Sequence, residues 1–149
     1  MKVVATNRKA RHDYHIIDTY DAGMVLIGSE VKSLRQGNVS MSDAYAGIHD
    51  EEIFLFNLHI SAYQHSTTAR SDPKRKRKLL LNTREIKKLY GLVQQKGNTL
   101  IPLKIYFNDN GYAKVTLGIC RRKRLFDKKE KLLKKEIEHK VDRIKKAVR

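Results

Sequence analysis

The residues with the clearest chemistry are five consecutive cations, Lys74 to Lys78, which run directly into three leucines and end at Asn82. Lysine and arginine side chains bind phosphate groups, and phosphate contacts position a protein on nucleic acid. A charge run of this kind is commonly only a solvated loop. Here it follows a long polar segment and leads into an apolar strand, so its cations are expected to lie on a rigid frame. The run is therefore a candidate phosphate-binding site, in which Arg77 and Lys78 are expected to be exposed.

Asn82 has a structural role that the spacing predicts. It stands three residues before Glu85, as in a capping box, and apolar residues at 86, 89, 92 and 93 predict a helix over 83–97 with Gly97 at its end. The N-terminus of a helix is itself polar and forms hydrogen bonds to ligands. The cap therefore does not exclude a second role for Asn82 in a binding site.

Catalytic chemistry has little support in the sequence. The six histidines show no metal-ligand spacing, and no glycine-rich phosphate loop is present. His12 and Asp13 could be imagined as a ribonuclease pair, but adjacent residues of a strand point to opposite faces. We therefore predict no catalytic residue, no metal site and no cofactor. The histidines are His12, His15, His49, His59, His65 and His139.

The charge balance points to an anionic partner. The chain has 149 residues, with 32 Lys+Arg against 16 Asp+Glu, a formal net charge of +16. Such an excess repels itself unless a partner neutralises it, and nucleic acid is the usual partner of a basic domain. The apolar runs are far shorter than the roughly 20 residues that span a bilayer, so no membrane is expected. No signal peptide is evident, and the single Cys120 fits a reducing cytoplasm. We expect a monomer.

The segments that must position the cations read mostly as strands. A strand at 14–20 is expected to turn at Asp21–Gly23 into a second strand at 24–28, followed by a helix at 29–37 with Ser29 as N-cap. Hairpins are predicted at 42–60, turning at 49–51, and at 99–119, turning at "NDNG". About six strands with two or three short helices indicate a small closed barrel or a β-rich α+β domain.

The C-terminal segment, residues 121–149, differs from the rest. It holds 14 Lys+Arg and five acids, so it carries +9 of the net charge. Apolar residues at 133, 137, 141, 144 and 148 would form one stripe on a helix, although a helix this basic is marginal alone. The stripe also fits packing on the body, self-association or a membrane-surface helix. We expect residues 1–120 to form the body and 121–149 a basic tail, disordered alone and ordered on a partner.

Taken together, these motifs resemble the bacterial SsrA-binding protein family, also called small protein B (SmpB). The resemblance rests on "NRKARHDY" (7–14), "DAG" (21–23), "GSEVKSLRQGNVSMSDAY" (28–45), "RKLLLNTREIKKL" (77–89), "KGNTLIPLKIYF" (96–107) and "DKK" (127–129). It implies an oligonucleotide-binding (OB) type antiparallel barrel. It implies a non-enzymatic adaptor of trans-translation that binds the tRNA-like domain of transfer-messenger RNA (tmRNA, SsrA RNA) and delivers it to stalled ribosomes for peptide tagging.

The resemblance also implies specific site residues. Positions that contact RNA fall on Asp21, where the family usually has Glu, and on Leu80 and Asn82. Nearby positions add Glu30, Lys32 and Arg35, and we expect Arg75, Arg77 and Lys78 to contact the RNA backbone. The tail, helical on the ribosome, is implied to enter the messenger channel near the small-subunit decoding region. Its implied contacts are Lys123, Arg124, Asp127, Lys128 and Lys129, although Arg122 and Lys129 depart from the family pattern.

Two other classes stay open at this point. The first is a general OB-fold protein that binds RNA, of the ribosomal or initiation-factor-like kind. The second is a basic ribonuclease. Preference for the tRNA-like domain separates the expected adaptor from the general RNA-binding protein. RNA that stays intact in the presence of the protein separates both from the nuclease.

Overall fold

The computed structural model describes residues 1–62 and 72–123. These residues form nine strands and three helices. In chain order they are β1 (Lys2–Thr6), α1 (Arg8–Asp13), β2 (Tyr14–Met24), α2 (Gly28–Arg35), β3 (Val39–Ser40), β4 (Tyr45–His49), β5 (Glu52–Phe56), β6 (His59–Ile60), β7 (Arg77–Leu80), α3 (Thr83–Val93), β8 (Asn98–Phe107) and β9 (Ala113–Arg122). The prediction of a mainly β protein with short helices is confirmed.

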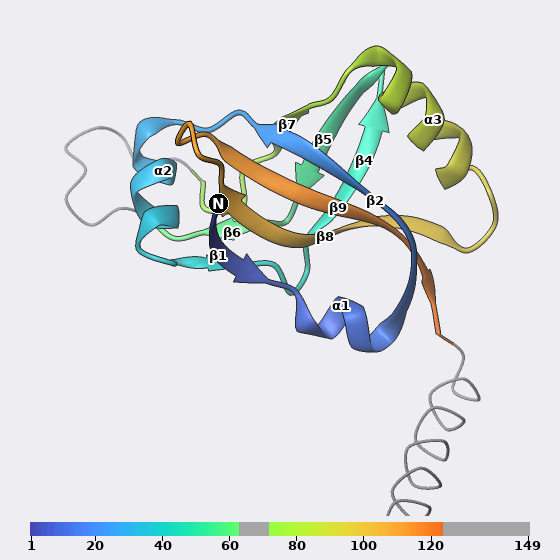
Figure 1. Cartoon of the computed structure of the whole chain (residues 1–149), viewed down its shortest axis with the longest axis horizontal. Coiled ribbons are helices and arrows are strands. Elements are labelled where there is room, and N and C mark those ends of the chain that lie inside the picture. The colour runs from blue at the N-terminus through green and yellow to red at the C-terminus, as the bar shows by residue number, and fades with distance from the viewer. Residues whose placement is uncertain (63–71, 124–149) are drawn as a thin grey trace, which may run out of the picture.

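Seven of the strands form one antiparallel sheet in the order β1-β8-β4-β5-β7-β2-β9. An additional pairing joins β8 to β9, so that the six strands from β8 to β9 form a closed circuit of pairings. One edge of β8 pairs with β9, while its other edge pairs with β4 at Leu100 and with β1 from Lys104 to Phe107. The short strands β3 and β6 form a separate pair. Figure 1 shows α2 and α3 at opposite ends of this body and α1 below it.

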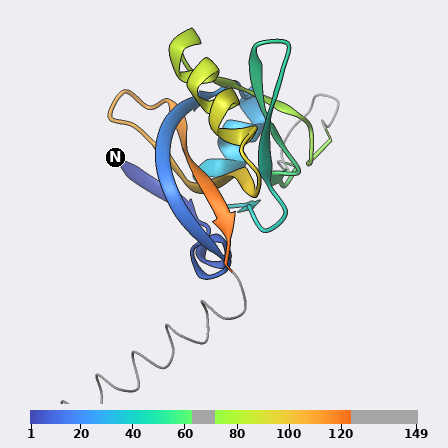
Figure 2. The same ribbon diagram turned by 90° about the vertical axis from the view of Figure 1, so that its right-hand side faces the viewer.

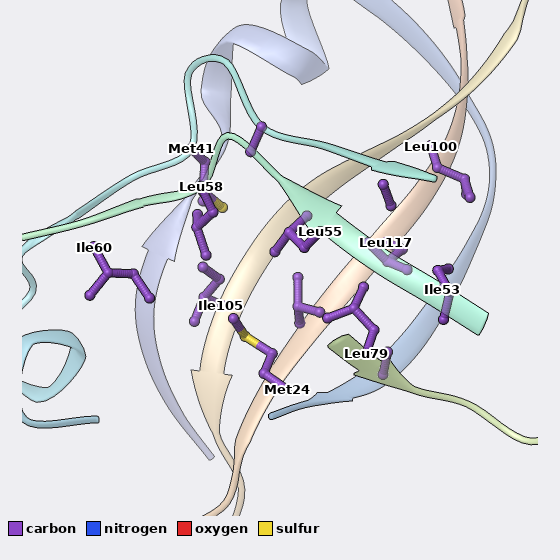
Figure 3. Close-up of a cluster of buried hydrophobic side chains, with 14 of the residues drawn as sticks. Met24, Met41, Ile53, Leu55, Leu58, Ile60, Leu79, Leu100, Ile105 and Leu117 are labelled. Carbon is purple, nitrogen blue, oxygen red and sulfur yellow. The ribbon is translucent and has the colours of Figure 1, made fainter. Parts of the chain in front are cut away.

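The core lies inside this circuit of strands. Side chains alternate between the two faces of a strand, and the inward positions of β5 and β9, with Leu79 of β7, are apolar and fully or almost fully buried. Figure 3 shows these side chains converging from several strands, among them Leu55, Leu79 and Leu117. Burial on one face leaves the alternate residues of the same strands on the outer face, where the candidate site lies.

Both predicted hairpins are confirmed. In the first, Asp50 and Glu51 connect β4 to β5 with positive φ angles of 50° and 64°, the backbone that two-residue hairpin turns require. In the second, Asn108 to Tyr112 connects β8 to β9, and Gly111 has a φ of 81°. These turns fix the registers of β4 with β5 and of β8 with β9.

The predicted turn at Asp21–Gly23 is wrong. β2 runs without interruption through it, and it curves round the body beside β9 (Figure 2). The small residues serve packing instead, since Ala22 is completely buried and a Cβ on Gly23 would lie 3.3 Å from Leu80 Cβ. The predicted strand at 24–28 is also absent, because β2 ends at Met24 and Gly28 already begins α2.

The helix predicted over 29–37 is confirmed as α2, but Ser29 is not its N-cap. The N-cap is Ile27, whose backbone N–H donates to Glu30 Oε1 at 3.0 Å. This is the half of a capping box in which the Glu reaches back to the N-cap. Glu30 takes this role because Arg75 and Arg77, far away in the sequence, hold its carboxylate in place. The local spacing does not reveal these contacts.

Residues 8–13 form α1, where the sequence analysis assumed an extended strand. Asn7 is its buried N-cap: its Oδ1 accepts from the Ala10 N–H at 3.1 Å, and its Nδ2 donates to the Pro102 carbonyl at 2.9 Å. At the other end of the chain, β9 continues through Arg121 and Arg122, which were assigned to the tail. β9 therefore continues two residues past residue 120.

Candidate nucleic-acid interface

The cation run 74–78 alternates between the two sides of the chain as it enters β7. Lys74, Lys76 and Lys78 are exposed, whereas Arg75 is half-buried and Arg77 is 0% exposed. From Arg75 onward the alternation follows the two-residue period of extended chain, and Lys74 precedes it in a turn in which the Arg75 N–H donates to the Asp72 carbonyl at 3.0 Å. The sequence Lys-Arg-Lys-Arg-Lys therefore separates into outward lysines and inward arginines.

The inward arginines bind Glu30 of α2. Arg75 Nη2 donates to Glu30 Oε1 at 2.5 Å, and Arg77 Nε donates to Glu30 Oε2 at 2.7 Å. Glu30 is only 3% exposed. The prediction that Arg77 is exposed on the RNA-binding face is therefore wrong, and Glu30 is likewise not available to RNA. The physical reason is that a buried guanidinium needs a fixed anionic partner, and α2 supplies one.

Arg77 also binds three backbone carbonyls. Its Nη1 donates to the carbonyls of Leu58 (2.5 Å) and Arg75 (2.9 Å), and its Nη2 donates to that of Pro73 (3.0 Å). Every nitrogen of this guanidinium thus has a partner within the protein. Arg77 connects the segment after β5, the segment before β7 and the start of α2.

The ionisation of this cluster follows from burial and charge. Burial raises the pKa of Glu30, but hydrogen bonds from Arg75 and the Ile27 N–H, with the charge of Arg77, outweigh it and hold that pKa below its ordinary value. Burial also lowers the pKa of Arg77, an effect that the Glu30 carboxylate opposes. Each group therefore favours the charged form of the other, and the pair is a structural contact.

The outward lysines share their face with an aromatic ring and an acid of β5. Lys76 Nζ lies 4.3 Å from the centroid of the Phe54 ring, and Lys78 Nζ lies 3.2 Å from Glu52 Oε1. Lys78 is exposed, as predicted. An exposed pair such as Lys78 with Glu52 contributes little to stability, so the ammonium group can exchange this partner for a phosphate at small cost.

The three positions implied to contact RNA from the body lie together. Leu80, 55% exposed, is paired with Gly23 across β7 and β2. Asp21 is two residues from Gly23, so it lies on the same outer face, one diagonal step from Leu80. Asn82 follows Leu80 and is exposed at the start of α3. Residues about sixty positions apart in the sequence thus form one surface.

The Asp21 carboxylate is held by the neighbouring strand. Thr116 Oγ1 donates to Asp21 Oδ1 at 2.6 Å across the β2–β9 pair. Burial, together with the nearby Asp21 charge, raises the pKa of the Tyr106 phenol on the same side. Thr116 was missed by the sequence analysis, because nothing in the local pattern of β9 marks it.

Asn82 is the N-cap of α3, as predicted. Its Oδ1 accepts from the Glu85 N–H at 2.9 Å. This bond uses the side-chain oxygen, and the NH₂ group of the amide points away from that contact. The cap therefore leaves donors on Asn82 for a ligand, which is the arrangement that a double role requires.

The remaining predicted residues are less closely grouped. Lys32 and Arg35 are exposed on α2, and the guanidinium carbon of Arg35 lies 4.4 Å from the centroid of the Phe107 ring. Lys123 follows β9, and its backbone N–H donates to the Asp13 carbonyl at 2.8 Å. The other predicted tail contacts, Arg124, Asp127, Lys128 and Lys129, lie outside the described residues.

His12 and Asp13 are closer than the sequence analysis allowed. Because they lie at the end of α1, His12 Nδ1 comes within 2.9 Å of Asp13 Oδ1. The imidazole is largely exposed on the surface. Within residues 1–62 and 72–123 no group of three or more His, Cys, Asp or Glu could hold a metal ion. No helix of that part of the chain is long and apolar enough to cross a membrane.

The fold and this surface define a small, strongly basic, mainly β domain with lysines on an open sheet face, a class that includes many nucleic-acid-binding domains. Comparison with known proteins then places it more narrowly. The family model "SmpB protein" matches residues 4–147. The chain belongs to the SmpB protein family.

Individual proteins similar to this chain agree with the match to the SmpB family model. An SsrA-binding protein of Pseudothermotoga lettingae is 52% identical over 141 residues, which cover 95% of each chain. One of Thermus thermophilus is 48% identical over 144 residues, which cover 97% of this chain and all of the relative. A chain in a solved structure described as "tmRNA-SmpB: a journey to the center of the bacterial ribosome" superposes with a TM-score of 0.71. It is 52% identical, covering 87% of this chain and 94% of that one.

Proposed function

We propose that this protein is an RNA-binding adaptor of trans-translation. It binds the tRNA-like domain of transfer-messenger RNA and delivers it to stalled ribosomes, where the unfinished peptide is tagged and released. Membership of the SmpB family supports this role, and so do the printed names of its relatives. The adaptor has no catalytic step of its own, and it works in the cytoplasm, where ribosomes translate.

The observation that carries the proposal is the surface shared by Asp21, Leu80 and Asn82. An exposed leucine beside a carboxylate and an amide offers one apolar contact with a nucleobase and two hydrogen-bonding groups for base edges. RNA is read in this way mainly at unpaired loops, where bases are accessible. The lysines of 74–78 lie at the start of β7 and in the segment just before it, and they supply phosphate contacts.

The closed circuit of six antiparallel strands supports an OB-type barrel as the frame of this surface. OB folds bind single-stranded nucleic acid on an open sheet face. The surface formed by β2, β5 and β7 is such a face. The class of fold and the class of ligand are therefore consistent with each other.

The tail is proposed to act on the ribosome and not in the capture of RNA. It carries +9 and leaves +7 on residues 1–120, enough for an RNA partner. A basic segment with an apolar stripe gains order when it binds a preformed anionic groove. The messenger channel of the small subunit is a groove of this kind once the message has run out.

The test is a comparison of two RNAs with the purified full chain. Binding to the tRNA-like domain of tmRNA is measured beside a structured RNA of equal length at one stated salt concentration. We expect at least tenfold tighter binding to the tRNA-like domain, with both RNAs intact after several hours. Equal affinities would favour a general RNA-binding protein of the OB class, and cleavage would favour a ribonuclease.

A further inference from the structure

We propose that the RNA-contacting cations of the 74–78 run are its three lysines, and that Arg77, through Glu30, is the positioning residue that turns them outward. The inference rests on the proposed function, since RNA is the partner it assumes. It assigns opposite roles to two residue types in one run. Lysines bind the RNA backbone, while arginines bind the protein.

The side chains of the cation run 74–78 alternate in exposure. From Asp72 to Leu80 the chain alternates strictly between outer and inner positions, with the exposed residues at even numbers. Lys76 and Lys78 therefore project from the outer face, as does Leu80 at the end of β7, and Lys74 is exposed in the turn that precedes them. In that turn the Arg75 N–H donates to the Asp72 carbonyl at 3.0 Å. Extended chain rises about 3.3 Å per residue, so Lys76 and Lys78 lie roughly 6.6 Å apart along it. This is close to the spacing of successive phosphates along an RNA strand, so these two lysines can contact neighbouring phosphates.

Contacts outside the sheet hold that orientation. β7 is short, from Arg77 to Leu80, and it pairs with β5 from Arg77 to Leu79. Lys74 and Lys76 precede the strand, so sheet hydrogen bonding does not orient them. The contacts of the two arginines orient them, because Arg75 and Arg77 both bind the Glu30 carboxylate. With both arginines bound inward, Lys76 between them and Lys78 beside them are left on the outer side, and the turn at Pro73 and Lys74 leaves Lys74 exposed.

Arg77 also attaches the start of the cation run to the body. Its contacts with the carbonyls of Leu58 and Pro73 connect two segments that lie on either side of residues 63–71. The backbone bond from Ile60 N–H to the Pro73 carbonyl, at 2.9 Å, joins the same two segments. The start of the cation run is thus attached to the body at several points. A lysine at position 77 could not reproduce this, because its ammonium is a compact charge without the planar fork.

The chemistry of the outer lysines suits phosphate. Lysine is a flexible point charge that binds phosphate without demanding one geometry. The Lys76 ammonium lies over the Phe54 ring of β5, so its charge is held on the outer face of the sheet. Three cations held at the start of β7 and just before it would contact a phosphate backbone, whereas the bases are left to Asp21, Leu80 and Asn82. This division explains why a dense charge run adjoins a core strand.

The first experiment replaces all three lysines by glutamine. Affinity for the tRNA-like domain of tmRNA is measured between 50 and 200 mM salt. Loss of three phosphate contacts should reduce the slope of log K against log salt by about 2. Wild type should then lose about 20-fold more affinity than the variant across that range. The control variant removes three exposed lysines elsewhere and should keep a slope nearer to wild type; it carries Lys2→Gln, Lys9→Gln and Lys96→Gln.

The second experiment tests the positioning role at constant or increased charge. Arg77→Lys keeps the net charge, and Glu30→Gln keeps the shape of the side chain while raising the net charge by one. Each is measured at a temperature where its melting curve shows it folded. Simple electrostatics predicts tighter RNA binding by Glu30→Gln, because an acid is removed. If Glu30 and Arg77 position the lysines, Glu30→Gln should instead bind RNA more weakly. Its slope of log K against log salt should be smaller by about 0.7, the value of one lost phosphate contact.

The outcomes separate the claims. A lysine variant with the wild-type slope overturns the assignment of the lysines. Tighter or unchanged binding by Glu30→Gln overturns the positioning role, whether or not Arg77→Lys folds. If the wild-type protein shows no preference for the tRNA-like domain, the proposed function fails. In that case the slopes of log K against log salt, measured on the structured RNA of equal length, test the lysine assignment separately.

Discussion

Replacing Asn82 by alanine should produce two separable losses, one in stability and one in RNA binding. The stability loss follows from the cap, in which Asn82 Oδ1 accepts from the Glu85 N–H at 2.9 Å. Asn82 is exposed, so water can take the place of the lost acceptor. The cost is therefore that of an ordinary N-cap, about 1 kcal/mol. For a domain of this size that lowers the melting temperature by about 4 °C.

The binding loss has a different origin. If the free amide donors of Asn82 bond to RNA, their removal should cost about 1 kcal/mol of binding free energy, or roughly fivefold in Kd. Asn82→Ser separates the two effects, because serine caps a helix about as well as asparagine. Its hydroxyl is too short to replace the amide at the RNA. We expect Asn82→Ser to melt near the wild-type temperature and to bind RNA as weakly as Asn82→Ala.

The assay combines thermal unfolding followed by circular dichroism with RNA binding at 25 °C on the same preparations. Asn110→Ala is the matched control, since Asn110 is an exposed asparagine in the β8–β9 turn that caps no helix. It should change neither quantity. Full recovery of RNA binding in Asn82→Ser would mean that Asn82 is only a cap. An unchanged melting temperature in Asn82→Ala would refute the stability argument.

Three further predictions follow from the same structure. Thr116→Val removes the hydroxyl that donates to Asp21 and should weaken RNA binding by about fivefold without unfolding the protein; the exposed Thr19→Val is the control, and equal behaviour of the two would remove Thr116 from the site. Glu30→Gln should be less stable than wild type at neutral pH, because a lowered carboxylate pKa contributes stability above its ordinary value of 4.5. That contribution is lost as the pH falls through the lowered folded-state pKa, so denaturant titrations from pH 7 to pH 3 should show the two proteins converging; a constant difference would contradict the argument. A chain that ends at Lys123 should fold and bind the tRNA-like domain within a few-fold of normal, yet fail to tag peptides on stalled ribosomes in a reconstituted translation assay. Ending it earlier, within β9, would break strand pairing.

The sequence determined those features that depend on local spacing. Two hairpins, the helices α2 and α3, and the Asn82 cap were all predicted from turn residues, apolar periods and a residue three positions away. These signals work because a turn or a cap is formed by neighbours in the chain. The charge of +16 likewise indicated an anionic partner without any knowledge of the fold. The family motifs pointed to Leu80 and Asn82, and both prove to be exposed.

Only the tertiary structure decided which charges face a partner. The sequence analysis treated Arg77 and Lys78 alike, because adjacent cations in a polar run carry no mark of inward or outward direction. Their sides are set by Glu30, which is 47 positions from Arg77 in the chain and reaches it only through the packing of α2 against the start of β7. In the same way, Thr116 meets Asp21 across 95 positions. Burial of a charge costs so much free energy that a single distant carboxylate determines which side of the chain turns inward.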